Sequence, residues 1–198
     1  ALGVATSTVI GGCAKEEPPV KFWQQGNFRP VSEEVTATSL KVEGSIPPEL
    51  NGLYVRNGTN SSTGISEHFF GGDGMMHGVR LEGGQAQWYR NRYIDTPVYR
   101  KEVGKFSAPK PENTTSAVSL IHHGGELMSL GDFGYPYLIN PDDLSTKGVF
   151  NYDGKLTGNM TAHPRIDPVT GELLFFGYNV MQPYLTYMRA DAAGNMLQ

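Results

Sequence analysis

The sequence predicts an all-β fold, because its apolar residues alternate, its turns are rich in glycine, and these turns recur at a regular interval. The chain has 25 Gly and 13 Pro among 198 residues, and they lie between short apolar runs, as is typical of proteins with many strands and turns. Alternation with a period of two is the pattern of a strand, whose successive side chains point to opposite faces. We therefore expect sheets from about Val35 onward.

Three β-hairpins are predicted from alternating segments on either side of glycine-containing turns. The first turns at Gly83-Gly84, a pair that favours the primed turn types found in hairpins. The second turns at Gly124-Gly125, and the third turns at 167–171 before the apolar run 173–176. Gly83 and Gly124 are 41 residues apart, and Gly124 and Gly171 are 47 apart. These intervals match the roughly 40 to 50 residues of a four-stranded propeller blade. Without them, a β-sandwich would be an equal alternative.

The last residues resemble an unfinished hairpin. Residues 184–188 have the pattern of a strand, 191–195 that of a turn, and 196–198 that of the beginning of a return strand. We therefore expect residues 35–198 to form the first blades of a propeller that is truncated at its C-terminal end. Propeller blades bury their faces against neighbouring blades, so we expect this chain alone to be inactive.

The N-terminal residues predict a lipoprotein signal followed by a leader. Residues 1–14 are apolar and small, and they include Ile10-Gly11-Gly12-Cys13, which resembles a bacterial lipobox with Cys13 as the site of lipid attachment. Residues 15–34 are rich in Pro and charge and are expected to be an irregular leader. These features predict a lipid-anchored protein on the periplasmic side of a bacterial cell envelope. The alternative is an incidental cysteine on a flexible tail of a cytoplasmic protein.

Composition excludes several classes of partner and site. Lys and Arg total 16 against 20 for Asp and Glu, and the basic residues are scattered, so no nucleic-acid partner is expected. Cys13 is the single cysteine of the chain, which excludes an intrachain disulfide and a cysteine-based metal cluster. The glycine cluster 71–74 is followed by His77 rather than by the glycine of a dinucleotide fingerprint, so no nucleotide-binding loop is expected there. Because the chain cannot form a cysteine-based cluster, a metal site would use histidines or carboxylates.

Five histidines are available, and none belongs to a local metal-binding motif: His68, His77, His122, His123 and His163. His163 is the best placed, because the following Pro164 restricts its backbone at the expected start of a strand. We interpret His122-His123, which precedes a hairpin turn, as surface or edge packing.

Five ordered blocks of sequence resemble the N-terminal part of the carotenoid cleavage oxygenase family. They are 27–34 (NFRPVSEE), 44–58 (GSIPPELNGLYVRNG), 68–77 (HFFGGDGMMH), 90–93 (RNRY) and 161–178, which begins with TAHP. The resemblance implies a seven-bladed propeller with a non-haem Fe(II) on its axis, held by four histidines from different blades. It also implies addition of dioxygen across a carbon–carbon double bond of an apolar polyene, a carotenoid or apocarotenoid, to give two carbonyl products.

Carried over residue by residue, the resemblance makes His163 the first of the four iron ligands, and the other three match nothing in this chain. His77 matches a family histidine that is not a ligand and is expected to support its loop. Tyr93 matches a position that faces the substrate in some members, although packing between strands is the more common role of such an aromatic residue.

Two departures from the family pattern bear on this interpretation. Thr59 stands where Pro usually follows Arg56-Asn57-Gly58, which affects the local turn. Gly131-Asp132 stand where stilbene-cleaving members have a Lys after the residue matching Leu130, which favours carotenoids over stilbenes. A stilbenoid-cleaving dioxygenase and a catalytically inactive carotenoid- or lipid-binding propeller lipoprotein remain the alternatives.

Overall fold

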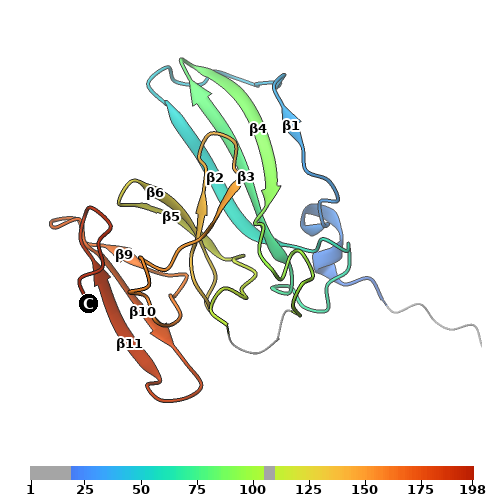
Figure 1. The fold of residues 1–198 in the computed structure, drawn as a ribbon. Coiled ribbons are helices and arrows are strands. Elements are labelled where there is room, and N and C mark those ends of the chain that lie inside the picture. Colours follow the sequence, from blue (N-terminus) through green and yellow to red (C-terminus); the bar gives the residue numbers. More distant parts are fainter. Residues whose placement is uncertain (1–18, 105–109) are drawn as a thin grey trace, which may run out of the picture.

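The computed structural model describes residues 19–104 and 110–198 as three antiparallel sheets with two short 3-10 turns (Figure 1). The turns are η1 (Phe22–Gln24) and η2 (Gly26–Phe28). Sheet A has the order β1-β4-β3-β2 and consists of β1 (Thr36–Ala37), β2 (Gly52–Asn60), β3 (Asp73–Glu82) and β4 (Gln85–Tyr93). Sheet B has the order β5-β6-β7-β8 and consists of β5 (Ser119–His123), β6 (Glu126–Leu130), β7 (Tyr137–Ile139) and β8 (Thr146–Val149). Sheet C has the order β11-β10-β9 and consists of β9 (Arg165–Ile166), β10 (Leu173–Tyr178) and β11 (Leu185–Ala190).

The all-β prediction and all three predicted hairpins are confirmed. The β3–β4 turn has φ values of 56° and 77° at Gly83 and Gly84, and the β5–β6 turn has 58° and 82° at Gly124 and Gly125. Two consecutive residues with positive φ define the primed turn that matches strand twist, and glycine adopts it without steric strain. The third hairpin pairs β9 with β10. The return segment after β11 forms a bridge between Ala190 and Met196.

Sheet B lies between the other two sheets and buries both of its faces (Figure 1). Leu127 of β6 packs into a core with residues of sheet A, including Met76. The next residue, Met128, packs into a second core with Leu173 and Phe175 of sheet C. Since neighbouring side chains on a strand point to opposite faces, this alternation places three sheets face to face in chain order. That is the arrangement expected of successive propeller blades.

No helix within the described residues is long and apolar enough to cross a membrane.

Candidate metal centre

The segment that carries His163 connects sheet B to sheet C and is held by both. Thr161 and Ala162 are 1% and 2% exposed. The Thr161 N–H donates to the carbonyl oxygen of Phe176 on β10 over 2.7 Å. On the side of sheet B, the Ser119 hydroxyl donates to the carbonyl oxygen of Ala162 over 2.5 Å, and the Ala162 N–H lies 3.4 Å from Oδ1 of Asp132. The backbone that leads to His163 is therefore fixed from two sheets.

His163 itself projects from this buried segment. Its side chain is 62% exposed, and its Nε2 lies 3.4 Å from Oδ1 of Asp132. Its backbone N–H donates to Oγ1 of Thr161 over 3.2 Å. The residue stands two positions before β9 rather than within a strand. An exposed imidazole on a fixed backbone is available to bind a metal and is not used for core packing.

The other histidines have structural partners or lie on the surface. His77 is half-buried on β3, with Nδ1 2.9 Å from the Tyr89 hydroxyl. Burial, followed by the nearby charge of Arg56, lowers the pKa of His77 and so favours its neutral form. His122 is exposed, whereas His123 is 7% exposed and its Nε2 lies 2.9 Å from the carbonyl oxygen of Gly171. Packing is thus the role of His123.

The donor set in the described residues fits one ligand of the implied iron site. No group of three or more His, Cys, Asp or Glu side chains that could hold a metal lies within 19–104 and 110–198. His163 alone combines the exposed imidazole with the position predicted for a ligand. A neutral imidazole is a suitable ligand for Fe(II), and the site would need further ligands to bind the metal tightly.

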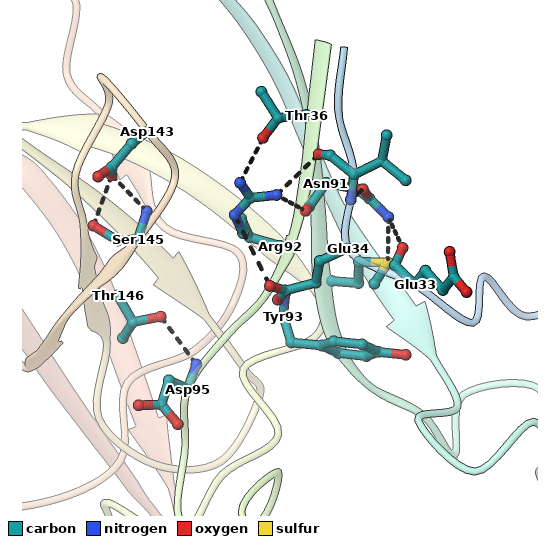
Figure 2. A network of polar contacts seen from close by, with 12 residues as sticks. Glu33, Glu34, Thr36, Asn91, Arg92, Tyr93, Asp95, Asp143, Ser145 and Thr146 are labelled. Carbon is teal, nitrogen blue, oxygen red and sulfur yellow. Dashed lines mark hydrogen bonds and ion pairs between the residues drawn. The ribbon is translucent and has the colours of Figure 1, made fainter.

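Tyr93 ties the leader to β4 (Figure 2). It is 7% exposed, and its hydroxyl is 2.5 Å from Nδ2 of Asn60 and 3.2 Å from the carbonyl oxygen of Val31. Its backbone N–H donates to Oε1 of Glu34 over 2.8 Å, and its ring stacks on Tyr99 with centroids 4.6 Å apart. Burial is the largest cause that raises its pKa. These contacts give Tyr93 a packing role, and contact with substrate stays a prediction.

Cys13, the predicted lipid attachment site, lies outside the described residues.

Two residues of the site were not identified from the sequence as partners of the His163 segment. They are Ser119, which bonds to the Ala162 carbonyl, and Asp132, which lies close to the Ala162 N–H. Ser119 lies 43 positions before Ala162 in the sequence, and Asp132 lies 30 positions before it. No local spacing rule connects residues so far apart, and only the packing of sheet B against sheet C brings them together.

The comparisons with known proteins agree with this fold. Residues 28–198 match the family model described as retinal pigment epithelial membrane protein. A carotenoid cleavage oxygenase of Mycobacterium tuberculosis is 40% identical over 164 residues, which are 78% of this chain and 33% of that protein. The carotenoid 9,10(9',10')-cleavage dioxygenase 1 of Arabidopsis thaliana is 37% identical over 208 residues, covering 86% of this chain and 38% of that protein. The chain thus spans about a third to two fifths of these relatives.

Solved structures show the same relationship in three dimensions. The lignostilbene dioxygenase of Pseudomonas brassicacearum matches with a TM-score of 0.72 at 27% identity, over 86% of this chain and 40% of that one. A variant of the Synechocystis apocarotenoid oxygenase matches with a TM-score of 0.73 at 26% identity, over 85% and 42%. The three sheets correspond to an N-terminal portion of the propeller of these oxygenases. The chain therefore belongs to the carotenoid cleavage oxygenase family, whose family model carries the retinal pigment epithelial membrane protein description.

Proposed function

We propose that the full-length protein carrying this chain is a non-haem Fe(II) dioxygenase that cleaves a carbon–carbon double bond of a carotenoid or apocarotenoid. The observation that carries the proposal is the exposed imidazole of His163 on a segment fixed by two propeller sheets, in a chain of this family. Iron, when bound, would supply a site that binds and activates dioxygen. The balance of the reaction is one double bond and one dioxygen to two carbonyl groups, with one oxygen atom in each.

The residues of this chain would provide one ligand and its orientation. His163 would hold the metal through its ring, and the bonds that Ser119 and Phe176 make to the preceding residues would keep that ring in place. Such fixing of ligands by their surroundings is common in metal sites. The remaining ligands would come from the part of the full-length protein that corresponds to the region of the relatives beyond this chain.

Aromatic side chains belong to the same stretches of chain that contact the His163 segment, and they support an apolar substrate. Phe133 follows Asp132 and is 56% exposed, and its ring packs edge-on against Tyr178 with centroids 4.7 Å apart. Phe176, whose carbonyl oxygen anchors Thr161, is 38% exposed and lies 6.1 Å from Tyr178 between ring centroids. Aromatic side chains in this part of the fold suit a hydrocarbon chain better than a polar substrate.

The test is a turnover experiment on the full-length protein. The protein is reconstituted with Fe(II) without oxygen and is then given an apocarotenoid and isotopically labelled dioxygen. We expect two carbonyl products, each with one labelled oxygen. A hydroxylated stilbene is assayed in parallel, and a higher kcat/KM on the stilbene would favour the stilbenoid-cleaving alternative. Polyene binding without oxygen uptake would identify the inactive propeller lipoprotein.

We also propose that the protein is held at the bacterial cell envelope through Cys13. A cluster of exposed aromatic rings that follows the predicted lipobox supports a membrane location. Phe22 and Phe28 are 56% and 55% exposed and lie 5.8 Å apart between ring centroids, and Phe69 lies 5.6 Å from both. Phe70, 5.0 Å from Phe69, is 71% exposed. Aromatic side chains in this number suit the interfacial region of a bilayer.

Mass spectrometry of the native N-terminus is expected to find Cys13 carrying a diacylglyceryl group and an N-acyl chain, since these chains together anchor a protein stably. Cys13→Ser should move the protein from the membrane to the soluble fraction, whereas the matched Ser7→Ala change should leave it in the membrane. An unmodified Cys13 on a soluble protein would favour the cytoplasmic alternative.

A further inference from the structure

Ser119 holds the peptide group that immediately precedes the predicted iron ligand. That peptide group consists of the carbonyl of Ala162 and the N–H of His163. Its carbonyl oxygen accepts the Ser119 hydroxyl over 2.5 Å, and its N–H donates to Oγ1 of Thr161 over 3.2 Å. Both polar ends of the plane are therefore held. On the other side of His163, Pro164 restricts the backbone.

Ser119 is itself held in place from sheet A. Nδ2 of Asn57 on β2 lies 2.7 Å from the carbonyl oxygen of Ser116 and 3.4 Å from that of Ser119. The same nitrogen is 3.0 Å from Oγ of Ser129, which also bonds to the Ser116 hydroxyl at 2.8 Å. A series of hydrogen bonds thus runs from β2 through β5 to the segment before β9. It makes the orientation of the His163 peptide group depend on how three sheets pack.

We propose that Ser119 is a positioning residue for His163, and that its hydroxyl sets the direction in which the imidazole leaves the segment. The inference rests on the proposed function, because it assigns Ser119 a role toward the iron that His163 would hold. Ser119 acts on the imidazole indirectly, through the Ala162 carbonyl. Without the hydroxyl, this carbonyl loses its partner from sheet B, and the peptide plane is held only through its N–H.

The test compares Ser119→Thr with Ser119→Val in the full-length protein. Both side chains are β-branched and suit a strand, but only threonine keeps the hydroxyl. We expect the threonine variant to release iron to a chelator at the parental rate and the valine variant to bind iron about tenfold more weakly, at the lower end of the range for residues that orient metal ligands. The visible spectrum of the cobalt(II)-loaded protein should change in the valine variant only.

Ser129→Ala is the control for stability. Its hydroxyl belongs to the same series of bonds and is buried, but it bonds to Asn57 and Ser116 rather than to Ala162. It should lower the melting temperature and weaken iron binding less than Ser119→Val does, because it leaves the bond from the Ser119 hydroxyl to the Ala162 carbonyl in place. Should the valine variant not fold, Ser119→Ala takes its place.

Two negative results are distinguishable. Equal iron affinity of the threonine and hydroxyl-free variants, in a parent that binds iron, would overturn the positioning role alone. A parent that binds no iron would overturn the proposed function and this inference with it.

Discussion

Replacement of His163 by alanine in the full-length protein is expected to abolish iron binding and double-bond cleavage and to leave the propeller folded. The ring is 62% exposed and contributes little to either hydrophobic core, so its removal leaves no cavity. Its loss takes away one ligand of the proposed site, and metal sites seldom form without their full set. We expect activity to fall by more than the roughly 10- to 100-fold typical of residues that only orient ligands.

His77→Ala is the matched control. The His77 ring is half-buried and bonds to Tyr89, so its removal should lower stability by about 1 to 2 kcal/mol, the range for a lost buried hydrogen bond. Protein that stays folded should retain iron and activity. Iron content, a thermal melt and product analysis are all needed, since activity alone does not separate an unfolded protein from a metal-free one.

The opposite pattern would contradict the assignment. If His163→Ala retains iron and normal turnover while His77→Ala loses iron with its fold intact, then His77 is the ligand and the carry-over from the family is wrong.

The parts of the fold that the sequence predicts are those encoded locally. The turn at Gly83-Gly84 requires two consecutive residues with positive φ, and glycine is the residue type that signals this. The alternation around Leu127 and Met128 likewise assigns one residue to each face of a strand. The order in which the sheets stack required the turn interval and the family resemblance, because no local pattern specifies which faces meet.

Of the candidate site, the sequence predicted His163 alone, and its role as an iron ligand stays a prediction. The resemblance singled out this residue, but the groups that hold it come from positions far away in the sequence. The same limit applies to Tyr93, whose motif indicated a possible substrate contact. Its hydroxyl is bonded to Asn60 and to the leader at Val31, and these partners are visible only when the chain has folded back over β2 and β4.

Gly177→Ala is expected to destabilise the protein by about 3 kcal/mol, at the upper end of the usual range for an overpacked interior. A Cβ at this buried position on β10 would lie 2.0 Å from the backbone carbonyl oxygen of Asn159 and 3.2 Å from Cε of Met188. Neither the strand nor the facing segment is free to give way. Nδ2 of Asn159 donates to the carbonyl oxygen of Tyr178 over 3.1 Å, and its Oδ1 accepts the N–H of Gly134 over 3.0 Å.

The consequence should reach the candidate metal centre, because relief of this clash must move β10 away from residues 159–161. That movement would stretch the 2.7 Å hydrogen bond from the Thr161 N–H to the carbonyl oxygen of Phe176. Thr161 lies two positions before His163, so the change should reach the imidazole. The urea midpoint of the full-length protein measures the loss of stability, and iron release to a chelator measures the effect on the segment. Gly158→Ala is the control, since a Cβ there meets nothing within 4 Å, and its stability should stay within about 0.5 kcal/mol of the parent. An unchanged midpoint for Gly177→Ala would show that sheet C does not pack this closely against the segment that carries His163.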